Sequence, residues 1–183
     1  MGNTYTQIHI HAVFAVKNRT ALLSKEWRDR LYQYMGCIIK DQGHKVLAIG
    51  GTPNHVHLFF GLHPSQSLSS LMLRVKRETS EWINREKLTL GRFQWQNGYG
   101  AFSYSKSQIS NVINYIQNQE QHHARKSFRE EYLDILEKFG IEYDGLYWHS
   151  IAPGRRITDK NYHLNKTVVA NSKGYKLIHI TED

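Results

Sequence analysis

The stretch that decides the fold is Gly50-Gly51-Thr52-Pro53-Asn54-His55-Val56-His57-Leu58-Phe59-Phe60-Gly61. Its first five residues are typical of a turn, and the apolar run that follows is typical of a strand. Side chains alternate along a strand, so His55 and His57 point to one face while Val56 and Leu58 point to the other. Two imidazoles on one strand face can hold a divalent ion. The alternative is a pair of partly exposed strand histidines without metal, and a His-x-His pattern alone does not decide between the two.

The segments on either side of this stretch predict an α+β fold. Residues 5–16, 45–49 and 55–61 have strand composition, and a fourth strand lies within 93–105. Apolar residues at spacings of three and four predict helices over 25–39 and 68–85, the second with Ser67 as its N-cap. The order strand, helix, strand, strand, helix, strand is that of the ferredoxin-like split βαβ fold, a four-stranded antiparallel sheet covered by two helices. In the common topology its first and third strands are central, which would place His55 and His57 in the middle of the sheet.

A further helix is predicted over residues 107–124, and it has two distinct faces. One face is apolar, and the other is a polar stripe that contains Tyr115 and, one turn later, Gln119. The stripe is either a solvated surface or a functional one. A last helix is predicted over 128–139, ended by Gly140. Beyond it, residues 145–183 change in character, with short strands expected at 167–170 and 175–180.

Length and composition favour one globular domain with an anionic partner. The 183 residues are 40% hydrophobic, which suffices for a core, and the net charge of +8 is typical of nucleic-acid-binding proteins. Basic side chains that could face phosphates, or simply face solvent, occur near the first strand and in the 68–85 helix: Lys17, Arg19, Arg74, Lys76 and Arg77.

Cysteine usage and the chain's start favour the cytoplasm. The single cysteine, Cys37, allows no intrachain disulfide, and its place in the first helix suggests a buried, inert thiol. We see no signal-peptide pattern at the start and no apolar run long enough to span a bilayer, so no membrane association is expected.

Several of these segments together resemble a known family, the IS200/IS605-type single-tyrosine transposases of the HUH nuclease group. The matching segments cover roughly the first 145 residues in the family's order. They are the opening strand from Tyr5 to Arg19, Pro53-Asn54-His55-Val56-His57-Leu58, Trp95-Gln96-Asn97-Gly98-Tyr99-Gly100-Ala101-Phe102-Ser103, Tyr115-Ile116-Gln117-Asn118-Gln119, His122-His123, Glu131-Tyr132 and Gly140-Ile141-Glu142-Tyr143-Asp144. The family's fold is the ferredoxin-like one predicted above.

The resemblance implies a specific site. By position, His55, His57 and Gln119 would be metal ligands and Tyr115 the nucleophile. The ion would be Mg²⁺ or Mn²⁺, and two histidines favour Mn²⁺ in the test tube, because Mg²⁺ prefers oxygen. His9 and His11 form a competing His-x-His pair, but they match no catalytic position of the family and are interpreted as structural. Tyr99, Tyr104 and His122 lie near the motifs and rank below Tyr115 and Gln119 as candidates.

The resemblance also implies an activity and partners. The expected function is cleavage and rejoining of single-stranded DNA through a 5′-phosphotyrosine, with recognition of hairpins at the element ends. The protein would be a homodimer in a prokaryotic cytoplasm, in which active sites can be shared between subunits. Residues 1–144 would form the transposase domain and 145–183 an extension of unknown role, longer than in compact family members. Alternatives are a domesticated relative that processes repeated palindromes, a DNA-hairpin-binding protein without catalysis, and a nuclease that uses water.

Overall fold

A four-stranded antiparallel sheet forms the centre of the first of two compact units, residues 1–125 and 126–183. The computed structural model describes residues 5–123 and 127–141. In chain order the first unit contains β1 (His9–Ala15), the 3-10 turn η1 (Lys17–Arg19), α1 (Lys25–Asp41), β2 (Lys45–Thr52), β3 (His55–Gly61), α2 (Leu68–Arg85), β4 (Gly100–Tyr104), the 3-10 turn η2 (Lys106–Gln108), α3 (Ile109–Gln117) and α4 (Gln119–His123).

The strand order β2-β3-β1-β4 confirms the predicted α+β, ferredoxin-like arrangement, with the first and third strands at the centre. Every neighbouring pair is antiparallel. β3 begins and ends where the sequence indicated, and His55 and His57 lie on one face of this central strand. In the register, Ala15 is opposite His55 and Val13 is opposite His57.

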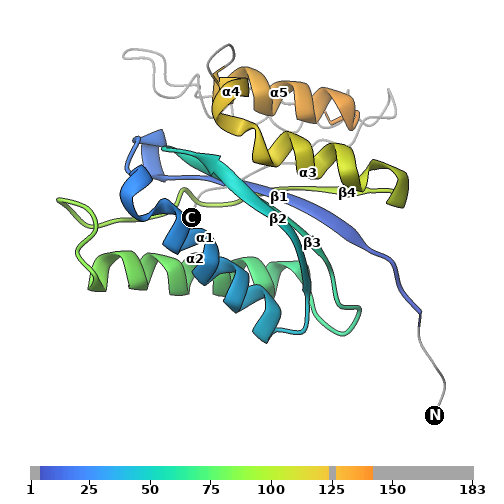
Figure 1. Cartoon of the computed structure of the whole chain (residues 1–183), viewed down its shortest axis with the longest axis horizontal. Coiled ribbons are helices and arrows are strands. Elements are labelled where there is room, and N and C mark those ends of the chain that lie inside the picture. Colours follow the sequence, from blue (N-terminus) through green and yellow to red (C-terminus); the bar gives the residue numbers. More distant parts are fainter. Residues whose placement is uncertain (1–4, 124–126, 142–183) are drawn as a thin grey trace, which may run out of the picture. The chain divides into compact units, whose positions relative to one another are not determined.

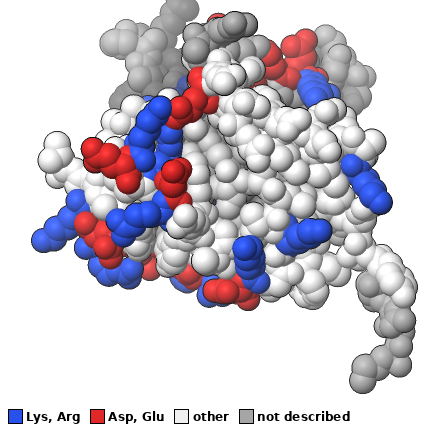
Figure 2. Space-filling view, in the orientation of Figure 1, with Lys and Arg blue, Asp and Glu red and all other residues white. Residues whose placement is uncertain are grey.

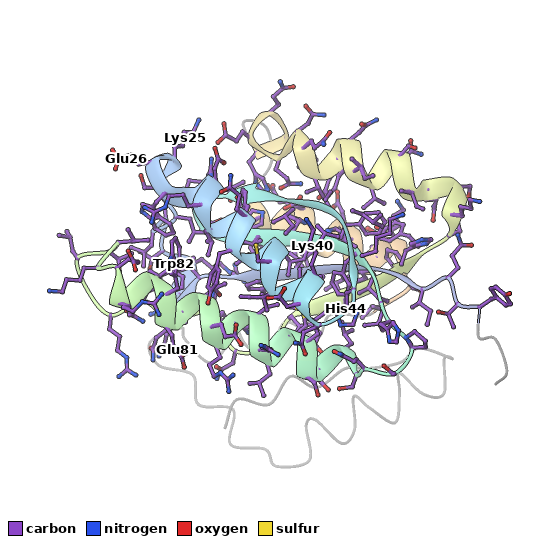
Figure 3. The ribbon with its side chains drawn as sticks, turned by 60° about the horizontal axis from the view of Figure 1, so that its bottom comes forward. Lys25, Glu26, Lys40, His44, Glu81 and Trp82 are labelled. Atoms are coloured by element: carbon purple, nitrogen blue, oxygen red, sulfur yellow. The ribbon has the colours of Figure 1, made fainter. Side chains whose placement is uncertain are left out.

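Two helices cover one face of the sheet and α3 covers the other (Figure 1). α1 and α2 bury the main apolar core against alternate residues of β1 and β3, such as Phe14, Leu58 and Phe60. Figure 3 shows these helices side by side, with Trp82 of α2 facing α1, where its ring meets Trp27 and Tyr34. The same view places Lys25 and His44 at opposite ends of α1, and Ser67 caps α2 as predicted, accepting from the backbone of Ser70.

The second face carries a smaller apolar cluster and the histidines. Val112 and Ile116 of α3 pack on Ala48 and Phe59 of the sheet. β2 runs to Thr52 rather than ending at residue 49, so Gly50 and Gly51 are strand residues and not part of the turn. Gly50 pairs with His57, and a Cβ added there would lie 2.5 Å from the carbonyl oxygen of Ile116. The missing side chain therefore lets the backbone of α3 rest directly on β2.

Two further expectations about unit 1 are corrected. The helix predicted over 107–124 is broken at Asn118, which has φ −99° and ψ 20° and separates α3 from α4. Cys37 is exposed, not buried, because it lies on the outer side of α1. Among the described residues, no helix is long and apolar enough to cross a membrane.

The described part of the second unit holds α5 (Phe128–Lys138), as predicted. A capping box begins the helix: the Ser127 side chain accepts from the Glu130 backbone, and the Glu130 carboxylate accepts from the backbone of Ser127. Gly140, at φ +64°, follows its end. The strands expected at 167–170 and 175–180 lie outside the described residues.

Candidate metal and nucleophile site

His55 is held by the turn that precedes it. The ring is fully buried, and its Nδ1 lies 2.7 Å from Asn54 Oδ1 and 2.8 Å from Thr52 Oγ1. An amide oxygen only accepts, so a hydrogen bond to Asn54 Oδ1 requires the proton of His55 to sit on Nδ1. The second nitrogen, Nε2, lies 3.4 Å from Gln119 Oε1. A lone pair on Nε2 therefore faces an amide oxygen, which is an arrangement that suits two ligands of one cation.

His57 is held by a residue from another strand. Its Nδ1 lies 2.9 Å from Nε2 of His11, and both rings are buried. The planes of these two rings are 22° apart and their centroids 5.1 Å apart, so the 2.9 Å contact joins the facing edges of two nearly parallel rings. The ring of His57 also lies 4.9 Å from that of His55, centroid to centroid. The two histidines of the motif thus converge, and each has its Nδ1 occupied by a fixed partner.

Tyr115 is placed over this pair by α3. Its ring centroid lies 5.8 Å from that of His57 and 6.2 Å from that of His11, both nearly perpendicular. Tyr115 is half-buried, and its neighbour Ile116 packs into the apolar cluster on β2 and β3. Since Gln119 contacts His55, the described unit brings together all four residues that the sequence singled out: His55, His57, Tyr115 and Gln119.

Tyr115 and Gln119 do not share one continuous helix, contrary to the prediction, because Asn118 separates them. Gln119 is buried at the start of α4. The next residue, Glu120, forms ion pairs with α1. Glu120 accepts from Lys25 Nζ at 2.8 Å and from the buried guanidinium of Arg28. These hydrogen bonds lower the pKa of Glu120 below its ordinary value.

Three further histidines lie in this cluster: His11, interpreted above as structural, His122, ranked below Tyr115 and Gln119, and His123, to which no role was assigned. His11 contacts His57 directly. The ring of His122 lies 5.4 Å from that of Tyr115, and the ring of His123 lies 4.7 Å from that of His55. The sequence did contain a signal that His11 lies near the site. The predicted topology makes β1 and β3 neighbours, so the His-x-His pair of β1 and that of β3 both fall in the centre of the sheet.

Lys76, a candidate DNA contact, lies against the loop that precedes β4, and its contact with DNA stays a prediction. Its Nζ donates to the carbonyl oxygens of Gln96 and Gly98, both at 2.6 Å, and lies 5.7 Å from the ring centroid of Phe14. Burial lowers the pKa of Lys76 to about 8. The ammonium thus anchors the 96–98 segment before β4.

Arg74 and Arg77 belong to a local ion-pair network on α2. Arg74 Nε lies 2.6 Å from Glu78 Oε1, and Arg77 lies 3.8 Å from the same oxygen. On the face seen in Figure 2, Lys and Arg side chains are interleaved with Asp and Glu rather than gathered into one basic patch. Their part in DNA binding therefore stays a prediction.

Lys17 and Arg19 lie in η1, where the chain leaves β1. Lys17 Nζ donates to Gln94 Oε1 at 3.0 Å, and the side chain is exposed. Asn18 and Arg19 both have left-handed backbone, with φ 56° and 55°. This tight turn presents two cations at the end of a central strand, and their contact with DNA also stays a prediction.

Comparison with known proteins decides the family. The model of the family described as "Transposase IS200 like" matches residues 4–119, which is more than half of the chain. The chain belongs to this family. IS200-like proteins are DNA transposases, enzymes of DNA recombination, and the match ends at Gln119, so it contains all four singled-out residues.

Individual relatives agree with this family. The chain is 25% identical to the ISDra2 transposase TnpA of Deinococcus radiodurans over 119 residues, which are 62% of this chain and 84% of that protein. In fold it is similar to the crystal structure of a putative transposase from Deinococcus radiodurans, with a TM-score of 0.53, 23% identity, and coverage of 65% of this chain and 96% of that one. It is also similar to a REP-associated tyrosine transposase bound to a REP hairpin, with a TM-score of 0.51, 16% identity, and coverage of 67% and 73%.

Proposed function

We propose that this IS200-like transposase cleaves and rejoins single-stranded DNA through a 5′-phosphotyrosine on Tyr115. The observation that carries the proposal is the position of the Tyr115 ring, 5.8 Å from the ring of His57, above two converging buried histidines. Two buried imidazoles and a buried amide, next to a half-buried phenol, are costly to desolvate, so such a cluster favours a functional role.

The donor set of the site fits a divalent cation. His55 Nε2 and Gln119 Oε1 are 3.4 Å apart, and adjacent ligands of an octahedral ion with bonds of about 2.1 Å lie about 3 Å apart. His57 would supply the second imidazole. Two nitrogen ligands suit Mn²⁺ better than Mg²⁺. When bound, such an ion neutralises charge on a phosphate oxygen and orients the bond to be broken.

The chain's residues then have separate tasks. Tyr115 Oη forms a bond to phosphorus, and the bond between phosphorus and the 3′ oxygen breaks. The phenol proton is lost and the departing 3′ oxygen gains one, so the products are a 5′-phosphotyrosine and a free 3′-hydroxyl. Attack of another 3′-hydroxyl on the phosphotyrosine reverses these changes and joins two strands without an external energy source. His55, His57 and Gln119 would hold the ion, and through it the phosphate would keep its position during both steps.

The same proposal includes the partners. Hairpins in single-stranded DNA are the expected substrate, supported by the similarity in fold to a protein solved with a REP hairpin. We further propose a homodimer in the cytoplasm of a prokaryotic cell, with residues 1–144 as the transposase domain and 145–183 as an extension. The basic charge of +8 supports binding to a polyanion.

The experiment incubates the protein and Mn²⁺ with labelled single-stranded DNA from both sides of the gene, followed by denaturing electrophoresis. Wild type, Tyr115→Phe and Tyr104→Phe are compared, because Tyr104 is a second tyrosine whose ring lies 6.0 Å from that of His11. We expect a protein–DNA adduct with wild type and Tyr104→Phe and none with Tyr115→Phe. An adduct with Tyr115→Phe would refute the assignment. Cleavage by all three without an adduct would indicate a nuclease that uses water, and binding without cleavage would indicate a hairpin-binding protein.

A further inference from the structure

We propose that His11 is a positioning residue that fixes the tautomer of His57, so that the Nε2 lone pair of His57 is available to the metal. This inference rests on the proposed function, because the metal role of His57 is part of that proposal. It assigns a task to His11 of β1, which the proposed reaction does not otherwise use.

The sheet register brings the two rings together. His11 is opposite Phe59, and Val13 is opposite His57, so His11 and His57 are diagonal neighbours on one face of the central strand pair. Diagonal side chains of this size reach one another, and here Nε2 of His11 lies 2.9 Å from Nδ1 of His57. The planes are 22° apart, which allows an in-plane hydrogen bond between the rings. His11 is 1% exposed, so water does not compete for this bond.

The chemistry of imidazole assigns the direction of the hydrogen bond. A neutral ring carries one proton, and the nitrogen that binds a metal must be the other one. If His57 binds through Nε2, its proton is on Nδ1, which must donate to an acceptor. The structure places His11 Nε2 at 2.9 Å from that atom, and His11 Nε2 then accepts the hydrogen bond. Hydrogen bonds of this kind commonly fix the tautomer and orientation of metal-binding histidines.

The two motif histidines are therefore oriented by different means. For His55 the acceptor is Asn54 Oδ1, supplied by the adjacent residue in the hairpin. For His57 the acceptor is on another strand, 46 residues away in the sequence. This hydrogen bond uses the Nε2 lone pair of His11, so His11 cannot bind a metal through Nε2 at the same time.

Two measurements test the proposal on the full-length protein. Long-range ¹H–¹⁵N spectra of the histidine rings report which nitrogen of His57 carries the proton without metal. Titration with Mn²⁺, followed by the electron paramagnetic resonance signal of the free ion, gives the metal affinity. The variants are His11→Phe, which removes the acceptor, and His11→Gln, whose side-chain oxygen can accept. His9→Phe is the matched control, since His9 lies on the same face of β1 two residues away and its ring meets Phe59.

We expect wild-type His57 to carry its proton on Nδ1, and His11→Phe to weaken Mn²⁺ binding by about 10- to 100-fold. His11→Gln restores most of the affinity, and His9→Phe leaves it within about twofold. An Nε2–H tautomer of His57 in wild type would overturn the proposal, even if no variant folds. Equal Mn²⁺ affinity of His11→Phe and His9→Phe would also overturn it. Wild type that binds no Mn²⁺ and forms no adduct would instead refute the proposed function, and this inference with it.

Discussion

The contact of α3 with β2 yields a quantitative prediction for Gly50→Ala. The new Cβ would lie 2.5 Å from the carbonyl oxygen of Ile116 and 2.9 Å from its Cγ2. An ordinary carbon–oxygen contact is about 3.3–3.6 Å, so the contact of 2.5 Å is about 0.8–1.1 Å too short. The oxygen is backbone and cannot rotate away, so α3 and β2 must move apart by most of that distance. Overpacking of this kind costs about 1–3 kcal/mol, which lowers the melting temperature by about 2–12 °C in a protein of this size.

The shift should affect activity more than stability, because Tyr115 is the neighbour of Ile116. A displacement of about 1 Å in a reacting group can reduce the rate about 100-fold. The matched control is Gly61→Ala, a strand position where the added Cβ meets Lys45 Cβ at an ordinary 3.5 Å. Thermal unfolding gives the stability, and the rate of adduct formation at a temperature where both variants are folded gives the activity. Gly50→Ala with the stability and rate of Gly61→Ala would show that α3 does not depend on this contact.

Three further predictions concern contacts around the site. Glu120→Gln should destabilise the protein at neutral pH by weakening the partner of buried Arg28. Because the fold lowers the pKa of Glu120, the difference in stability between wild type and Glu120→Gln should disappear as the pH falls below the ordinary range of a carboxyl group. Urea unfolding at several pH values measures this difference. Burial lowers the pKa of Lys76 to about 8, against an ordinary value of about 10.4. Between these two pH values the folded state binds fewer protons than the unfolded state, so the stability of wild type relative to Lys76→Met should rise with pH. A stability difference that stays constant over this range would contradict the prediction. Thr79→Val should cost about 1–3 kcal/mol by leaving the buried indole N–H of Trp95 without its acceptor at 3.0 Å, whereas Thr79→Ser, which keeps the hydroxyl, should cost less in the same unfolding experiment.

The fold could be predicted because its local signals agree with one another. The alternation of β3, the N-cap at Ser67 and the spacing of apolar residues in α1 and α2 each depend on neighbouring residues, and the element order then allowed few topologies. The break at Asn118 was not predictable from periodicity, because polar residues follow it and no glycine or proline marks it. The extent of β2 was misjudged, since Gly50 and Gly51 have turn composition but are required by the close approach of α3.

The candidate site could be predicted where its residues form a motif within one element. His55 and His57 follow from strand alternation, whereas Tyr115 and Gln119 as nucleophile and ligand followed from the family resemblance. The contact of His11 with His57 depends on the register of β1 against β3, and sequence patterns do not fix a register to within one residue. A shift by one residue would turn its ring to the opposite face of the sheet.

The break at Asn118 gives Tyr115 and Gln119 partly different supports, although α3 and α4 both contact β2. α3 is held through Val112 and Ile116 on β2 and β3, while α4 is held through Glu120 on α1. A change that loosens one helix therefore need not move the other. Glu120→Gln should weaken metal binding through Gln119 more than it affects the position of Tyr115, and Gly50→Ala should do the opposite. If instead both variants changed metal affinity and adduct formation in the same proportion, the two helices would act as one body, and the break would have no mechanical consequence.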